Sequence, residues 1–153
     1  GMTEPQRAHG IARLKAAAAV QFCLPGVPSI YYGDEAGMAG YADPFNRGTY
    51  PWAHRDESLT AYFRRLGQIR RRADCLKSGA FRCICADGPL LAFERSSEQD
   101  RLLCVCNAAA EPRTLTVPDG WEAAEALIGT APTCTEWCMP GESAAILYAS
   151  HAE

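Results

Sequence analysis

The spacing of apolar residues predicts two amphipathic helices in the first half of the chain. In residues 5–24, the positions that share one helical face are Ile11, Leu14, Ala18 and Phe22. A second helix is predicted to start near Asp56, which is a favourable N-cap, and to run to about Lys77 before Gly79. Its predicted buried stripe consists of Leu59, Tyr62, Phe63, Leu66 and Ile69.

From residue 80 onward, the pattern changes to short apolar runs separated by turn residues. We expect strands at residues 81–86, 90–95, 102–107, 114–117, 123–127 and 144–149. Intervals of roughly 8–12 residues between short strands are typical of an antiparallel sandwich. We therefore place a domain boundary at 78/79, with residues 79–153 forming a C-terminal β-sandwich domain.

The segment between the two helices predicts a short strand over residues 27–33 that ends in acidic residues. Pro25 and Gly26 terminate the first helix, and Pro28 directs the chain along an extended path. The β-favouring run Ile30-Tyr31-Tyr32 follows, and Gly33 then allows the backbone to bend. A strand whose carboxyl end opens into a loop with acidic residues is typical of the binding side of an α/β barrel.

The same segment resembles a known family. The runs that carry the resemblance are Leu24 to Glu35, Gly37-Met38, Asp43-Pro44-Phe45-Asn46-Arg47 and Tyr50-Pro51-Trp52. Together they resemble the eighth-strand region of the α-amylase family, glycoside hydrolase family 13. The Asp-Pro-x-x-Arg element is similar to that of the neopullulanase, cyclomaltodextrinase and α-glucosidase-like branch.

This resemblance implies an α+β chain in two parts. Residues 1–78 would be the last helix, strand and helix of a (β/α)8 barrel, and residues 79–153 the β-sandwich. In that family the catalytic nucleophile, the acid/base and a third acid follow strands four, five and seven, which would precede Gly1. The chain would therefore carry no catalytic residue of its own.

Asp43 and Arg47 are the predicted substrate-binding residues. A carboxylate accepts hydrogen bonds from adjacent hydroxyls, and a guanidinium presents a rigid fork of donors. The resemblance implies that Asp43 and Arg47 contact a glucose unit on the non-reducing side of the scissile bond. The alternative is an Asp–Arg pair that only stiffens the turn. Tyr41, Tyr50 and Trp52 are candidates for stacking on sugar rings, with packing as the alternative role of these aromatic side chains.

Tyr32 and Glu35 are assigned structural roles at the strand exit. Glu35 follows the predicted strand immediately, so we expect its carboxylate to accept hydrogen bonds from nearby backbone amides. If Asp34 and Glu35 continued the strand, they would face opposite sides and could not converge on one glycosidic bond. No catalytic motif and no metal or cofactor site is predicted.

Composition restricts the remaining classes of function. A net charge of −3 gives no general attraction to nucleic acid, and no apolar run approaches the length of a membrane span. The eight cysteines include two C-x-C pairs, Cys83/Cys85 and Cys104/Cys106, which would face a sandwich core. Reduced core thiols are the favoured interpretation and suggest a cytoplasmic protein; one or two disulfides and a zinc site are the alternatives.

The resulting hypothesis is a C-terminal fragment of a glycoside hydrolase that acts on maltooligosaccharides or α-glucans and is inactive alone. The alternative is a freestanding carbohydrate-binding or interaction module formed by the sandwich. Because strand 27–33 would lack both parallel neighbours, we also expect a homo-oligomer formed through residues 5–52.

Overall fold

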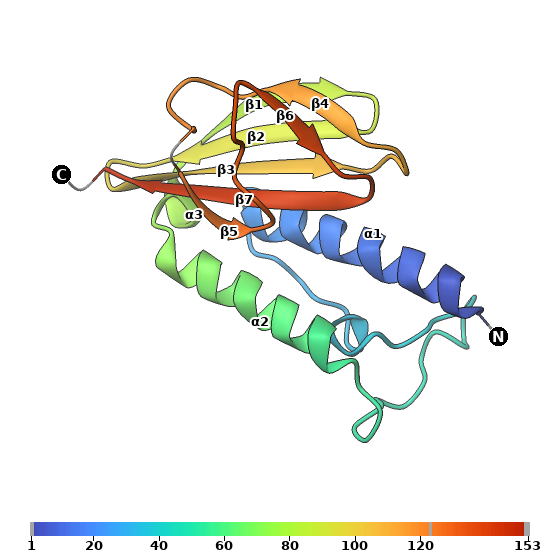
Figure 1. Ribbon diagram of the computed structural model, residues 1–153. Helices are drawn as coiled ribbons and strands as arrows, with labels where there is room; N and C mark the ends of the chain where they lie inside the picture. The colour runs from blue at the N-terminus through green and yellow to red at the C-terminus, as the bar shows by residue number, and fades with distance from the viewer. Residues whose placement is uncertain (1, 123, 152–153) are drawn as a thin grey trace.

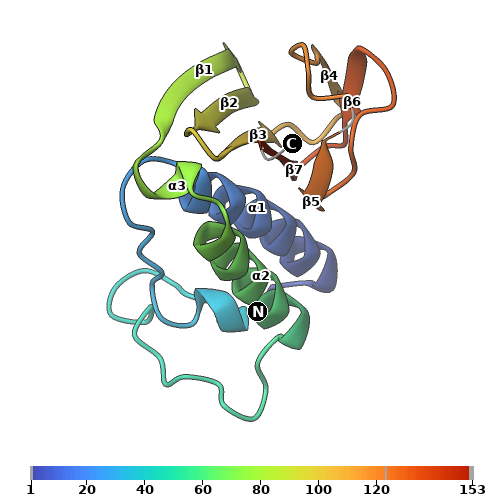
Figure 2. The same cartoon turned by 90° about the vertical axis from the view of Figure 1, so that its left-hand side faces the viewer.

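The computed structural model describes residues 2–122 and 124–151, which form three layers (Figure 1). Two long helices lie under a five-stranded sheet, and a two-stranded sheet covers the opposite face (Figure 2). The helical elements are α1 (Glu4–Cys23), the 3₁₀ turn η1 (Asp34–Ala36), α2 (Glu57–Arg72) and α3 (Cys75–Ser78). The strands are β1 (Ala80–Asp87), β2 (Leu90–Ser96), β3 (Asp100–Asn107), β4 (Arg113–Thr116), β5 (Glu125–Ile128), β6 (Glu136–Met139) and β7 (Ser143–Ser150).

Both sheets are antiparallel, as the strand spacing predicted. The larger sheet has the order β1-β2-β3-β7-β5, and the smaller one pairs β4 with β6. Strand β6 was not expected: Trp137 and Met139 are buried in alternation, but the exposed position between them is Cys138, so the residue types do not alternate in the sequence. The strand predicted at 123–127 is β5, and its residue 123 lies outside the described residues. The α+β class with antiparallel sheets is therefore confirmed.

Side-chain caps explain where the helices begin. Thr3 accepts a hydrogen bond from the backbone of Gln6, and the Gln6 side chain accepts one from the backbone of Thr3, which completes a capping box. Asp56 accepts a hydrogen bond from the Leu59 backbone at 3.0 Å, so its predicted N-cap role is confirmed.

The second predicted helix does not continue to Lys77. It ends at Arg72, and the short helix α3 starts at Cys75. The carboxylate of Asp100 accepts hydrogen bonds from the backbone N–H groups of Asp74 and Cys75, both at 2.8 Å. These donors are thus bonded to a side chain on β3 instead of to the carbonyl groups of α2, and the helix is interrupted there.

Two hydrophobic cores separate the three layers. The lower core lies between the helices and the large sheet, and includes Phe22, Leu66 and Phe93. The upper core lies between the two sheets and includes Val105, Trp121 and Trp137. Helices α1 and α2 therefore cover one face of the β-domain. The lower core, between the helices and the large sheet, contains residues from both sides of the predicted boundary at 78/79.

All eight cysteines are free thiols. Cys104 and Cys106 are buried in β3, as expected for core residues. Cys83 on β1 is exposed, so a core position for it was wrong, whereas Cys85 is half-buried and packs against the upper core. β1 is an edge strand, and its register against β2 shifts between these two residues, which turns the bulged strand away from the core.

The strand predicted over residues 27–33 does not form. No strand lies between α1 and α2, where every residue is described, and the segment pairs with neither sheet. Extended backbone becomes a strand only through hydrogen bonds to a neighbour, and this chain supplies none here. As a result Val27 is 92% exposed, and the side chains of Ile30, Tyr31 and Tyr32 are also exposed.

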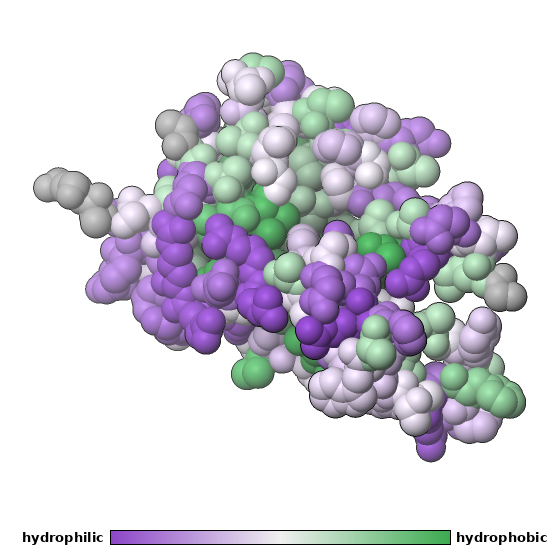
Figure 3. Space-filling view, turned by 60° about the horizontal axis from the view of Figure 1, so that its bottom comes forward, coloured by the Kyte–Doolittle hydropathy of each residue, from purple (hydrophilic) through white to green (hydrophobic). Residues whose placement is uncertain are grey.

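Figure 3 shows the surface of the molecule with the helical side turned toward the viewer. Seen from this side, strongly hydrophilic residues dominate the middle of the surface, with separate hydrophobic groups at its lower margin. No helix among the described residues has the length and apolar character needed to cross a bilayer.

Candidate functional site

The candidate site is the loop of residues 24–56, which leaves the end of α1 and returns to the start of α2. Arg70 of α2 fixes its first part by donating to the carbonyl groups of Phe22, Leu24 and Gly26. A second anchor is the Gln21 side-chain amide, which donates to the Ser29 carbonyl at 2.8 Å. Asp56 closes the loop, since its backbone N–H donates to the Ala36 carbonyl at 2.9 Å. The loop is therefore tied to the helices at both ends.

The acidic residues after the predicted strand lie in a 3₁₀ turn. Gly33 opens the turn with a φ of 95°, and an added Cβ there would lie 2.9 Å from the sulfur of Met38. The Oε2 of Glu35 accepts a hydrogen bond from the Gly33 backbone at 3.0 Å, which is the type of contact expected for this residue. Burial, with a further contribution from the Glu35 charge, raises the pKa of Asp34. Asp34 and Glu35 do not continue a strand, because the backbone coils here, so the opposed geometry of strand neighbours does not apply to them.

Tyr32 joins the two halves of the loop. Its hydroxyl donates to the Gly48 carbonyl at 3.0 Å, so the segment after α1 is linked to the segment that follows the Asp-Pro-x-x-Arg element. The Tyr31 and Tyr32 rings lie 5.0 Å apart. These contacts give Tyr32 a structural position, while its ring stays exposed.

Asp43 and Arg47 form an ion pair on the loop surface. Their side chains meet at 2.8 Å and are 61% and 67% exposed. Two turn hydrogen bonds bring them together, from Phe45 to the Ala42 carbonyl and from Arg47 to the Pro44 carbonyl. An exposed pair of this kind adds little stability, on the order of 0–1 kcal/mol. The remaining acceptor and donor positions of both groups are therefore accessible to a ligand.

The aromatic side chains of the loop face solvent. Tyr41 is 63% exposed, Phe45 75% and Trp52 77%. The rings of Tyr50 and Trp52 lie 4.6 Å apart, so these two form a pair. The three aromatic residues that the sequence offered for stacking on sugar rings therefore lie in this loop, and Tyr50 and Trp52 are close in space as well as in sequence.

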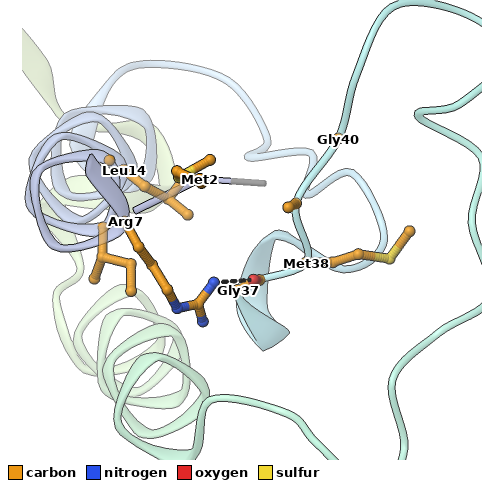
Figure 4. A pocket seen from close by; sticks show the side chains of 9 residues that line it. Met2, Arg7, Leu14, Gly37, Met38 and Gly40 are labelled. Carbon is orange, nitrogen blue, oxygen red and sulfur yellow. Dashed lines mark hydrogen bonds between the residues drawn. The ribbon is translucent and has the colours of Figure 1, made fainter. Parts of the chain in front are cut away.

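Two hollows flank residues 38–40. The first, of about 170 Å³, lies between α1 and the loop, where Arg7 reaches across to donate to the Gly37 carbonyl at 3.0 Å (Figure 4). Met2 and Leu14 line it from the α1 side, whereas the side chain of Met38 points away from the helix. This hollow is largely apolar, and Arg7 is the one charged residue among the described residues that line it.

The second hollow, of about 200 Å³, lies between the strand-exit turn and the Asp-Pro-x-x-Arg element. Tyr31, Tyr32, Asp34 and Asn46 contribute to its lining. The Oδ1 of Asn46 is buried and has no hydrogen-bond partner among the described residues. Asn46 is therefore a further polar residue of the Asp-Pro-x-x-Arg element, for which only Asp43 and Arg47 were predicted as binding residues.

The acidic side chains of the loop lie in different settings. Retaining or inverting hydrolysis of a glycosidic bond needs two carboxyl groups on either side of it. In this loop Glu35 is bonded to the backbone and Asp43 is paired with Arg47, whereas Asp34 lines the second hollow. The loop combines exposed aromatic rings with a carboxylate and a guanidinium, which is the chemistry of a site for polyhydroxylated ligands.

Comparison with known proteins finds that the relatives of this chain are enzymes of the α-amylase family. No protein-family model matches the chain. The chain is 46% identical over 85 residues to an amylopullulanase of Thermoanaerobacter thermohydrosulfuricus, covering 56% of this chain and 6% of the relative. It is 35% identical over 107 residues to a cyclomaltodextrinase of Thermoanaerobacter pseudethanolicus, covering 69% of this chain and 19% of that protein.

Two solved structures of enzymes of this family also match the fold of the chain. A debranching enzyme from Nostoc punctiforme matches 90% of this chain and 31% of its own with a TM-score of 0.78 and 29% identity. An Anoxybacillus α-amylase has the same fold over 94% of this chain and 33% of its own, with a TM-score of 0.79 and 24% identity. The predicted resemblance to the α-amylase family is confirmed, and the chain spans a third or less of each of these relatives.

Proposed function

We propose that this chain supplies the substrate-binding loop and C-terminal β-domain of a glycoside hydrolase that acts on α-glucosidic bonds. Asp43 and Arg47 bind a glucose unit, and the catalytic acids lie outside the chain. The observation that carries the proposal is the exposed Asp43–Arg47 pair, held at 2.8 Å on a loop anchored to both helices. The relatives named amylopullulanase and cyclomaltodextrinase support maltooligosaccharides or α-glucans as the ligand class.

The alternative of a freestanding β-sandwich module is less favoured by the packing. Phe22, Leu59 and Leu66 from the helices cover the lower face of the large sheet together with Phe93 and Ile146. A chain cut at residue 79 would expose that apolar face to water. The helices, and with them the loop, are therefore part of the functional unit.

Titration of the whole chain with maltoheptaose tests the proposal. We expect saturable binding without release of reducing sugar, and a loss of at least tenfold in affinity for Asp43→Ala and for Arg47→Ala. Lys77→Ala is the matched control, because it breaks an exposed ion pair with Asp74 outside the loop and should leave the affinity unchanged. Sustained hydrolysis that Asp43→Ala abolishes, or equal affinities for all variants, would contradict the proposal.

We also propose that the loop side of the molecule is an association surface, formed through residues 5–52, for a second copy of the chain. The exposed apolar side chains of Val27, Ile30 and Tyr31 support this proposal. In an intact enzyme the same segment would be the eighth strand of a barrel, between two parallel neighbours. The eight free thiols favour a reducing compartment, which suggests the cytoplasm.

A further inference from the structure

The second hollow contains a buried hydrogen-bond acceptor that has no donor within the described part of the chain. This acceptor is the Oδ1 of Asn46. Asn46 lines the hollow of about 200 Å³ together with Asp34 and the side chains of Tyr31 and Tyr32. Buried amide oxygens in native proteins almost always accept a hydrogen bond, so an unpaired one points to a donor that enters from outside the chain.

The loop holds Asn46 at the wall of this hollow. The Arg47 N–H donates to the Pro44 carbonyl at 3.1 Å, which closes a turn around Asn46. On the other side, a Cβ added to Gly40 would lie 3.7 Å from the Asn46 Cβ, which is ordinary van der Waals contact. The side-chain amide of Asn46 is therefore placed by its own turn and by the backbone of Gly40.

The side chains around the hollow carry negative charge without a positive partner. Asp34 is half-buried and lines the hollow. Among the described residues, neither Asp34 nor Glu35 takes part in an ion pair. None of the described residues that line the hollow is a lysine, an arginine or a histidine. A ligand that complements this hollow therefore carries a positive charge.

Aromatic and apolar groups form the rest of the wall. The ring centroids of Tyr31 and Tyr32 lie 5.0 Å apart, and both rings line the hollow. The side chain of Met38 points away from α1 (Figure 4), and its sulfur lies 2.9 Å from the place of a Cβ added to Gly33. Aromatic rings attract cations, and the thioether provides an apolar contact, so this wall suits an organic cation with a short alkyl group.

A metal ion fits this set of groups less well than an ammonium ion does. Ca²⁺ takes about six to eight oxygen ligands, and Mg²⁺ requires a near-ideal octahedron. The described residues contain no cluster of three or more His, Cys, Asp or Glu side chains that could hold a metal. A primary ammonium group has three N–H donors and no acceptor, which matches the unpaired oxygen of Asn46 and the carboxylate of Asp34.

We infer that the second hollow binds a small primary ammonium ion, with the Asn46 Oδ1 and the Asp34 carboxylate as acceptors and the Tyr31 and Tyr32 rings beside the charge. Burial and the Glu35 charge raise the pKa of Asp34, and a bound cation would lower it again. This ligand class differs from the neutral α-glucan of the proposed function. The inference therefore does not depend on that function.

Chemical-shift titration of the ¹⁵N-labelled whole chain with n-propylammonium chloride tests the inference. We expect saturable shifts of the Asn46 side-chain amide and of the backbone amides of Gly33 and Gly40. n-Propanol keeps the alkyl chain without the charge, and tetramethylammonium keeps the charge without N–H donors. Both should bind at least tenfold more weakly, because each lacks one part of a charge-assisted hydrogen bond.

Two substitutions should change the affinity for n-propylammonium in opposite directions. Asp34→Asn removes the charge at constant shape and should weaken binding at least fivefold. Asn46→Asp places a carboxylate oxygen at the buried acceptor and should strengthen binding at least threefold. Asp87→Asn is the matched control, because it removes the same charge from an exposed position at the end of β1 and should leave the affinity unchanged. The dispersion of the amide spectrum shows whether each variant is folded, and either substitution alone decides the question.

Several probes would overturn the inference. Equal affinities for n-propylammonium and n-propanol would show that the charge is not recognised, and the same shifts with potassium chloride would show an inorganic cation site. Preferred binding of acetate would show that the buried amide presents its NH₂ group instead. The same shifts with D-glucose would assign the hollow to the sugar site and leave the proposed function intact. Conversely, unchanged maltoheptaose affinity in Asp43→Ala would contradict the proposed function and leave the ammonium site intact.

Discussion

Arg95 joins the helical layer to the sheet, and its removal should destabilise the whole fold. The side chain is 2% exposed, and its guanidinium donates to three backbone carbonyls. Nη1 bonds to Cys23 at 3.0 Å, Nη2 to Gly79 at 3.0 Å and Nε to Ala80 at 3.3 Å. Cys23 is the last residue of α1, so the cation also lies at the negative end of the helix dipole. Burial lowers the pKa of Arg95, and no carboxylate among the described residues forms an ion pair with it.

The expected cost of Arg95→Met follows from these three bonds. Methionine retains an apolar stem but donates to none of the carbonyls, and each carbonyl left without a donor costs about 1 kcal/mol or more. We therefore expect the free energy of unfolding to fall by about 3 kcal/mol. Arg95→Lys should lose less, because an ammonium group still carries a charge but cannot match the fork of three donors.

Urea denaturation at neutral pH, followed by circular dichroism, measures this difference. The matched control is Arg13→Met on the exposed face of α1, which should change the free energy of unfolding by no more than about 0.5 kcal/mol. If Arg95→Met cost no more than Arg13→Met, the carbonyl contacts would not stabilise the fold and the reasoning would be refuted.

Two further predictions concern acid stability and self-association. Burial alone would raise the pKa of Asp100, but the hydrogen bonds from the Cys75 and Asp74 backbone outweigh it and lower that pKa. Its contribution to stability is therefore present above the unfolded-state pKa of about 3.9 and is lost as the pH falls through the folded-state value. The urea midpoint should fall between pH 7 and pH 3, and this fall should be larger for the unaltered chain than for Asp100→Asn. The control is Asp87→Asn at an exposed position, which should behave like the unaltered chain. An equally large fall for Asp100→Asn would contradict the prediction. Light scattering at micromolar concentration should give a molar mass at least twice the 16.6 kDa of one chain. Val27→Asp should reduce this mass to that of the monomer. A monomer in the absence of the substitution would exclude the interface.

Local sequence signals predicted the elements that depend on local interactions. The helix at residues 5–24 corresponds to α1, and the Asp56 cap places the start of α2 correctly. Short apolar runs between turn residues located β2, β3 and β7, whose central positions are buried. A helix cap forms between residues close together in the sequence, and the spacing of apolar residues can be read from the sequence directly.

Contacts between distant residues explain what the sequence could not predict. Helix α2 ends early because of Asp100, which lies 26 residues beyond Asp74. Arg95 donates to the carbonyl of Cys23, which lies 72 residues before it along the chain. Neither partner has a distinctive local pattern, since a charged residue in a strand is usually exposed. Such long-range polar contacts become visible only when the layers are assembled.

The loop of residues 24–56, which forms the candidate site, could also be predicted only in part. The residue types specified a turn, acids and aromatic groups, and the structure contains all of them. The strand at 27–33 was wrong because strand formation requires partners, and neither edge of this segment has one in the chain. The exposed side chains of Asp43, Arg47 and Trp52, however, are held by turns and by anchors from α1 and α2 that need no such partner. The geometry of the proposed sugar contacts can therefore persist in this chain although the barrel strand does not, and the maltoheptaose titrations measure that independence directly.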